Sequence, residues 1–308
     1  MPYGKFIIYK KQLSFDGGET WEDTDPLETT TSGDPIATYD TSEECEKSIL
    51  ADKYLTIIPR GDGAIKKIMN NDTFYYSTNS GTTWTSANTS TTISMTSGTP
   101  IYFKGTITPV QGYGVGEFSA STNYDVEGNP MSLLYGDDFI GETSLVGKDY
   151  AFNHLFSTGT AQGGGGNVVS AQNLALPATT LSRSCYFAMF MNCTILTTVP
   201  KGLLPATALT ENCYAFMFSS CSSLTTAPDL LAPTLTTSCY EWMFDGCSSL
   251  NSIKCLATNP SNDQTYNNPY TLGWVHQTSA NGTFYKYSNA NWAAGDNGIP
   301  NGWSVISI

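Results

Sequence analysis

Residues 176–203 read LPATTLSRSCYFAMFMNCTILTTVPKGL, and two close copies of this stretch follow. They are LPATALTENCYAFMFSSCSSLTTAPDLL from Leu204 and APTLTTSCYEWMFDGCSSLNSIKCL from Ala232. Each copy contains the block C-Y-x-x-M-F-x-x-C, and the opening cysteines are 28 and then 26 residues apart. A unit this short cannot bury its own apolar side chains, so successive copies must stack and share one core. The period therefore predicts a solenoid.

The shared letters of the block are expected to form the core. If the block is helical, its cysteines and methionine, spaced at i, i+4 and i+8, lie on one face. Two cysteines of one block would then be about 12 Å apart along the axis, beyond the reach of a disulfide. We therefore predict two columns of buried, unbridged thiols that act as small apolar residues. The predicted core residues are Cys185, Tyr186, Met189, Phe190, Cys193, Cys213, Tyr214, Met217, Phe218, Cys221, Cys239, Tyr240, Met243, Phe244 and Cys247.

A degenerate copy is expected ahead of the three. In Ala151–Phe156, the residues Phe152, Leu155 and Phe156 stand where the block has Tyr, Met and Phe. Terminal copies of a stack are atypical because they cap it, so we expect Phe156 to have a neighbouring copy on one side only. At the other end, we expect three tryptophans to cover the open core: Trp274, Trp292 and Trp303.

The blocks C-Y-x-x-M-F-x-x-C-[ST]-x-L-T-T-x-P resemble BspA-like leucine-rich repeats. Such repeats occur in surface proteins of gut bacteria and in tailed phages that infect them, including crAss-like phages of Bacteroides. The stretches GNPMSLLYG at 128–136, GTFYK at 282–286 and GIPNGW at 298–303 resemble segments that precede and close such arrays. The resemblance extends over roughly residues 98–308 and identifies a scaffold used for adhesion and display.

This resemblance implies a non-enzymatic virion structural protein, a head or tail fibre or decoration subunit. Its repeats would display an adhesion surface for a host-surface glycan or protein. By analogy with phage fibres, we expect a homo-oligomer, with a trimer favoured. The alternative is a bacterial cell-surface adhesin, which would require an export signal.

Composition restricts the partners. Charged residues make up 13% and the net charge is −13, which argues against binding nucleic acid, since that needs clustered Lys and Arg. Residues 1–52 hold 12 Asp or Glu against 4 Lys or Arg, whereas residues 160–257 hold 4 against 3. No stretch reaches the ~20 apolar residues of a membrane span. The first residues, MPYGKFIIYKKQ, lack the apolar centre of a signal peptide, so we expect synthesis in the host cytoplasm and a location on the virion surface.

The chain is expected to be mainly β with short helices, in four parts. These are an N-terminal attachment region (1–52), a β-sandwich-like domain (53–145), the leucine-rich-repeat solenoid (146–257) and a C-terminal cap (258–308). The acidic first part carries a strand-like segment, Lys5–Tyr9, and we expect residues 1–50 to contact other virion proteins by strand addition or wrapping. Alternating apolar residues between turn signals predict further strands at Lys53–Ile58, Ala64–Met69, Thr73–Ser77, Thr92–Met95, Pro100–Thr106, Gly116–Ser119, Thr283–Tyr287 and Gly302–Ile308.

Two octapeptides fit, or nearly fit, the Asp-box S-x-D-x-G-x-T-W. They contain Asp16 with Trp21, and Asn79 with Trp84. Sialidases carry this motif, so a glycan-processing enzyme is the third hypothesis. The motif is nevertheless expected to be structural, because its Asp or Asn side chain accepts hydrogen bonds from the backbone amides of the turn and its Trp packs beneath a hairpin.

The sequence offers no constellation for catalysis. The two histidines, His154 and His276, lie in different contexts, and G-x-S-x-G is absent. Zinc is disfavoured because there is no C-x-x-C and no paired histidine. We therefore predict no catalytic residue, metal or cofactor.

Overall fold

The computed structural model describes residues 50–157, 166–260 and 270–308. They belong to one compact unit, Leu50–Ile308, which is separate from the unit Met1–Ile49. The predicted strand Lys5–Tyr9 and the first Asp-box lie outside the described residues. Within those residues the fold is mainly β, as predicted, with one short α-helix, α2 (Ser132–Tyr135), followed by a 3-10 turn, η1 (Gly136–Phe139).

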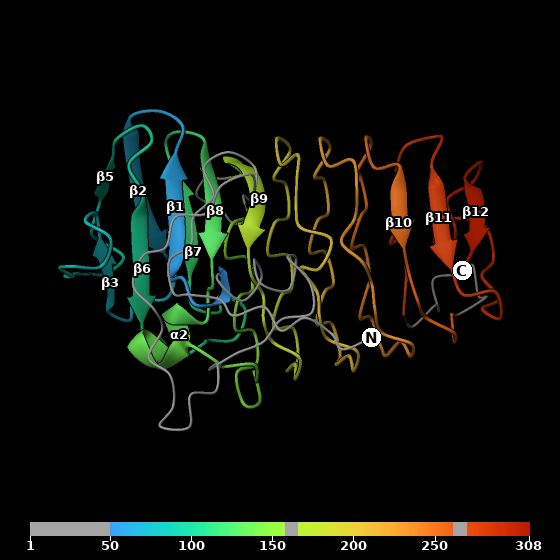
Figure 1. The fold of residues 1–308 in the computed structure, drawn as a ribbon, viewed down its shortest axis with the longest axis horizontal. Coiled ribbons are helices and arrows are strands. Elements are labelled where there is room, and N and C mark those ends of the chain that lie inside the picture. Colours follow the sequence, from blue (N-terminus) through green and yellow to red (C-terminus); the bar gives the residue numbers. More distant parts are fainter. Residues whose placement is uncertain (1–49, 158–165, 261–269) are drawn as a thin grey trace, which may run out of the picture. The chain divides into compact units, whose positions relative to one another are not determined.

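Two sheets form the first part of this unit. The longer has the order β4 (Thr85–Ala87), β3 (Phe74–Ser77), β6 (Ile101–Gly105), β1 (Leu55–Pro59), β8 (Tyr124–Gly128) and β9 (Val168–Leu174). The shorter has the order β5 (Ile93–Met95), β2 (Gly63–Ile68) and β7 (Glu117–Ala120) and lies behind it in Figure 1. Phe103 of β6 and Phe118 of β7 meet between the sheets, with ring centroids 4.8 Å apart.

The six strands predicted in this region are present within one or two residues of their expected limits. Their apolar residues alternate in and out, as in β6, where Ile101 and Phe103 are buried and Tyr102 is half-buried. The sequence did not predict β4, β8 or β9. In β4 and β9 the alternation of apolar and polar residues is weak, whereas β8 alternates but carries two acidic residues, a type that is depleted in strands.

Strand β9 joins the two-sheet region to the first copy of the repeat. On one side it pairs in parallel with β8. On the other side, the carbonyl of Val169 accepts from the Thr197 amide at 2.9 Å, and the Ala171 amide donates to the Thr198 carbonyl at 2.9 Å. Backbone pairing therefore continues across the boundary that the sequence suggested at residues 145–146.

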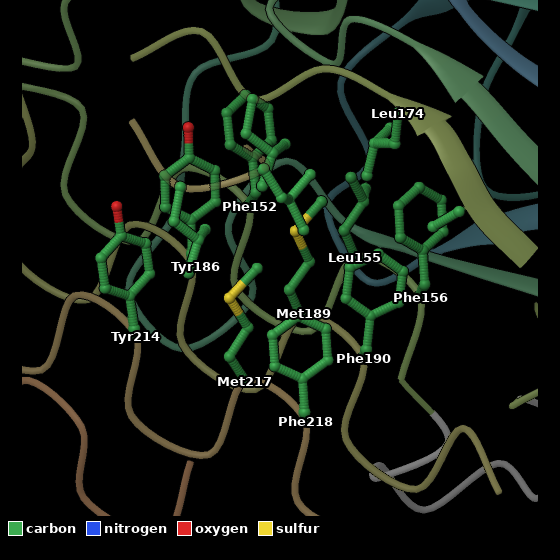
Figure 2. Packing of buried hydrophobic residues seen from close by; sticks show 14 of the residues in the cluster. Phe152, Leu155, Phe156, Leu174, Tyr186, Met189, Phe190, Tyr214, Met217 and Phe218 are labelled. Atoms are coloured by element: carbon green, nitrogen blue, oxygen red, sulfur yellow. The ribbon is translucent and has the colours of Figure 1, made fainter. Parts of the chain in front are cut away.

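The three copies pack against one another in register (Figure 1). The amide of Tyr186 donates to the Cys213 carbonyl at 3.0 Å, and the amide of Tyr214 donates to the Cys239 carbonyl at 3.1 Å. Equivalent side chains stack as well: the Tyr186 and Tyr214 rings are 5.7 Å apart with 10° between their planes. Figure 2 shows the resulting lines of side chains, which are Phe152, Tyr186 and Tyr214; Leu155, Met189 and Met217; and Phe156, Phe190 and Phe218.

The block is not a helix, and the helical expectation was wrong. Ser184, Ala188 and Asn192 have φ angles of 53°, 51° and 63°, which an α-helix does not allow. The backbone amides along the block alternate between acceptors in their own copy and acceptors in the next. The Met189 amide closes a turn on the Tyr186 carbonyl, whereas the Phe190 amide donates to the Met217 carbonyl of the next copy. A helix would use every amide internally, and here every second one holds a neighbouring copy. Because the turns recur every four residues, residues at i, i+4 and i+8 still face one side.

The degenerate first copy, Ala151–Phe156, is stacked on copy one. The amide of Phe152 donates to the Cys185 carbonyl at 2.7 Å, and that of Phe156 donates to the Met189 carbonyl at 2.9 Å. Phe156 has a neighbouring copy on one side only, as expected, but its other side is covered as well. Its ring lies 5.3 Å from Phe190 on one side and 6.2 Å from Phe118 of β7 on the other. The two-sheet region therefore closes the column of phenylalanines.

A further copy, which the sequence did not reveal, occupies residues 270–277. The amide of Tyr240 donates to the Tyr270 carbonyl at 3.0 Å, and that of Phe244 donates to the Trp274 carbonyl at 2.8 Å. Trp274 therefore stands where the block has Met, fully buried, rather than lying over an open end. The copy escaped notice because Tyr270 follows Cys239 by 31 residues and the stretch YTLGWVHQ keeps none of the block's letters.

A parallel three-stranded sheet runs from the third copy to the end of the chain. It has the order β10 (Ser252–Lys254), β11 (Thr283–Lys286) and β12 (Ser304–Ser307). Trp292 and Trp303 are each 7% exposed. Trp292 stacks on Trp274 at 5.3 Å, and the Trp303 indole donates to the Ser279 carbonyl at 2.7 Å. These two tryptophans thus cover the last part of the core, as expected for them.

Candidate functional site

The predicted core residues are all buried. The tyrosines, methionines and phenylalanines of the three blocks are at most 1% exposed, and the cysteines are 0% exposed. The seven cysteines in the described ranges form no disulfide among themselves. Burial raises the pKa of the Cys185, Cys239 and Cys255 thiols to about 12, so these thiols stay protonated at neutral pH and are poor nucleophiles.

The closing cysteines have a distinct structural role. Their Sγ atoms donate to a carbonyl of the preceding copy, from Cys193 to Phe156 at 3.2 Å, from Cys221 to Phe190 at 3.1 Å and from Cys247 to Phe218 at 3.0 Å. Among the opening cysteines, only Cys239 has a comparable contact, at 4.0 Å. The closing column therefore links successive copies through buried thiol hydrogen bonds, a role that sequence spacing alone did not suggest.

The two histidines lie in different copies, with three further copies between them. His154 Nδ1 is 2.9 Å from the Ser157 hydroxyl, and burial lowers the pKa of its imidazole. His276 Nδ1 is 2.8 Å from Asp245 Oδ1. Across the parts of the chain that the structure describes, no group of three or more His, Cys, Asp or Glu residues could hold a metal ion.

The second Asp-box forms a turn. Asn79 Oδ1 accepts from the Thr83 amide at 3.0 Å and from the Ser77 hydroxyl at 2.8 Å. Trp84 lies 4.9 Å from the Tyr54 ring, and Lys104 Nζ lies 4.3 Å above it. Both residues therefore stabilise the β3–β4 hairpin and its packing. Asp16 and Trp21 of the first box are outside the described residues.

Lys67 of β2 is a buried charge that sequence analysis missed, since it follows Lys66 on a strand that reads as half-exposed. It is 0% exposed, and its ammonium donates to the carbonyls of Val115, at 3.1 Å, and Asn70. Burial lowers its pKa to about 8. These bonds tie the end of β2 to the segment before β7, which is a structural role.

The described repeats also carry a row of half-buried rings that no spacing rule predicted. We call it the outer aromatic row: His154, Phe187, Phe216, Trp242 and His276. Successive ring centroids are 5.8, 5.3, 6.4 and 6.0 Å apart, and each ring is half-buried. The row was missed because its members differ in type and do not keep one position in the block. Phe187 follows its cysteine by two residues, whereas Phe216 and Trp242 follow theirs by three.

Residues 160–257, which contain the centre of this row, carry few charges, four acidic and three basic. Arg183 pairs with Glu211 at 3.2 Å, and the two side chains are 51% and 48% exposed. Lys254 pairs with Asp229 at 2.6 Å. The row therefore lies on a nearly neutral part of the protein, in contrast to the acidic residues 1–52.

Comparisons with known proteins add no relative: no family model, curated protein sequence or solved structure matches this chain. Separately, no helix within residues 50–157, 166–260 and 270–308 is long and apolar enough to cross a lipid bilayer. The outer aromatic row is a line of half-buried rings that crosses successive copies, with neighbouring ring planes inclined by 26° to 89°, and we take it as the candidate site.

Proposed function

We propose that this protein is a non-enzymatic structural protein of a phage virion, a head or tail fibre or decoration subunit. In this proposal residues 146–257 are a solenoid of BspA-like leucine-rich repeats closed by a C-terminal cap. The repeats present an adhesion surface to a glycan or protein of the host cell. Residues 1–50 attach the protein to other virion subunits, and the protein is a homo-oligomer, with a trimer favoured.

The observation that carries the proposal is the in-register packing of equivalent residues. It supports a display role because the same buried contacts hold each copy on the next, so the outward residues of successive copies form one ordered surface. The Phe190 and Phe218 rings are 5.6 Å apart and the Phe218 and Phe244 rings 5.8 Å apart, with their planes within 6°. A ligand bound to such a surface meets groups that are already ordered, so little conformational entropy is lost on binding.

A division of labour between the two ends of the chain is supported by charge and by compactness. The chain divides between Ile49 and Leu50, close to where the acidic first region ends. An acidic segment with few apolar residues gains order most readily against a partner. A neutral, regular surface suits many weak contacts with hydroxyl-rich molecules.

The first test is the location of the protein on particles. An antibody raised against residues 50–308 is used for immunogold labelling of purified phage particles and of uninfected cells of the same bacterium. We expect gold on the particle surface. Gold on uninfected cells, with none on particles, would refute the virion assignment and favour the bacterial adhesin.

The second test concerns attachment. Deleting residues 1–49 should leave the unit Leu50–Ile308 folded but absent from particles. Deleting residues 146–308 is not a suitable counterpart, because it would also remove contacts that the two-sheet region needs: β9 pairs with β8, and Phe156 packs on Phe118. Point substitutions on the repeat surface are used instead. Incorporation of the protein without residues 1–49 would show that attachment lies elsewhere.

A further inference from the structure

We propose that the outer aromatic row binds an unbranched, uncharged saccharide chain that runs along the stacked copies, with successive sugar rings against successive aromatic rings. This inference rests on the proposed adhesion function and names its ligand class and contact residues. The row includes Phe187, Phe216 and Trp242 at its centre, with His154 and His276 at its ends.

The backbone at three of these positions does not favour an aromatic residue, and the φ angle of His154 is 57°. Phe216 and Trp242 have φ angles of 57° and 50°, in the left-handed region, where a bulky residue is strained by about 1–3 kcal/mol. The equivalent position holds Ala188 in the first copy and Gly273 in the last, also with positive φ. The turn therefore accepts small residues and its geometry does not require the large half-buried rings, of which Trp242 also packs over Gly273 of the last copy.

Polar residues flank the row on both sides. The turns recur every four residues, so the positions four before and four after Phe216 have the same left-handed geometry. They hold Asn212 and Ser220, with φ angles of 56° and 62°, and both are half-buried. Around Phe216 the ring thus lies between two small polar residues. A pyranose ring matches this pattern, because it presents C–H groups on its faces and hydroxyls around its edge.

The small number of charged residues in the repeats favours an uncharged ligand over a polyanion or a basic peptide. Residues 160–257 contain only three basic residues, and two of them, Arg183 and Lys254, are already paired with carboxylates. A sulfated or phosphorylated polymer would find no free cluster of basic groups. Two of the four acidic residues in this range, Glu211 and Asp229, are the partners in those two ion pairs, so a basic partner gains little either.

The spacing of the row predicts a dependence on ligand length. Neighbouring rings are 5.3 to 6.4 Å apart, which is comparable with the size of one sugar ring. Each added sugar therefore meets one more aromatic ring on the same rigid surface. The added contact contributes to affinity without a second loss of translational and rotational entropy. Affinity should rise with chain length until the row is filled.

The test uses the full chain and isothermal titration calorimetry. The probes are linear cello-, malto-, xylo-, manno- and chito-oligosaccharides of one to six units, with heparin as the charged comparison. The variants are Phe216→Ala and Trp242→Gly, which copy the residues found at the same position in neighbouring copies, Ala188 and Gly273. Tyr75→Ala on β3 is the control, since Tyr75 is an aromatic residue that is 40% exposed outside the repeats.

We expect at least one neutral series to bind, with the hexamer at least tenfold tighter than the monomer. Each row variant should weaken binding about tenfold, which is the effect of losing about 1.4 kcal/mol of contact. The control should bind as the unaltered protein does. Failure of every neutral series at millimolar concentration, equal binding by the row variants, or binding of heparin alone would overturn the inference.

A parallel assay separates this inference from the proposed function. Fluorescently labelled full-chain protein is added to Bacteroides cells, with the same variants. Cell binding that is lost in Phe216→Ala and Trp242→Gly supports the inference. Cell binding that survives both substitutions overturns the ligand site and leaves adhesion standing, whereas absence of cell binding by the unaltered protein refutes adhesion itself.

Discussion

Replacing Phe218 with alanine removes the middle ring of the buried phenylalanine column. The ring is 0% exposed and lies between Phe190 and Phe244, at 5.6 and 5.8 Å. Its neighbours are held in place and do not fill the gap, because the Phe190 amide donates to the Met217 carbonyl and the Phe218 amide to the Met243 carbonyl, each at 2.9 Å. We therefore expect a loss of about 4 kcal/mol, within the range of about 3–5 for Phe→Ala in a core.

The comparison variant is Phe156→Ala, in the first, degenerate copy. The sequence suggests a smaller loss there, because an end copy has one neighbour. In the structure the Phe156 ring is also 0% exposed and lies between Phe190 and Phe118. We therefore expect the two substitutions to cost the same within about 1 kcal/mol. Tyr75→Ala, at an exposed position, serves as the control and should stay within about 0.5 kcal/mol of the unaltered protein.

The assay is urea denaturation followed by circular dichroism. With m near 3 kcal/mol/M, a loss of about 4 kcal/mol lowers the midpoint by about 1.3 M. The m value should be unchanged, since the same unit unfolds. A loss for Phe156→Ala below half of that for Phe218→Ala would refute the reasoning, because it would mean that Phe118 does not close the column.

Three other predictions concern the thiols and the hairpin. Cys221→Ala should cost about 1 kcal/mol more than Cys221→Ser, which keeps a donor to the Phe190 carbonyl; equal urea midpoints would contradict this. Stability should fall as the pH rises above about 9, because unfolded thiols lose protons near 9.0 while burial holds the pKa of Cys185, Cys239 and Cys255 near 12. Lys67, with its pKa lowered to about 8, acts in the opposite direction but is a single group, so an equal or higher urea midpoint at pH 10.5 than at pH 8 would refute the expectation. Asn79→Ala should cost about 1 kcal/mol, because the Thr83 amide loses its acceptor, and an unchanged midpoint would show that the turn does not depend on it.

The sequence by itself determined which residues meet. The period of the cysteine blocks placed Tyr186 against Tyr214 and Phe190 against Phe218, and it also aligned Phe152 and Phe156 with them. The requirement behind this can be recognised from the sequence alone, because a short apolar unit has no core of its own and must bury its apolar side chains against the next copy. The strands of the two-sheet region were predicted for a similar local reason, since alternation is a property of neighbouring residues.

Tertiary structure decided how the chain meets these requirements. The i, i+4, i+8 spacing fits both a helix and a run of four-residue turns, and only the backbone bonds between copies selected the turns, with positive φ at Ser184, Ala188 and Asn192. The junction through β9 and the last copy at 270–277 depend on pairing between segments that are distant in the chain. The paired segments do not resemble one another in sequence, so no motif reveals the pairing. The outer aromatic row depends on the same pairing, because its rings come from different positions of the block and become neighbours only when the copies are stacked.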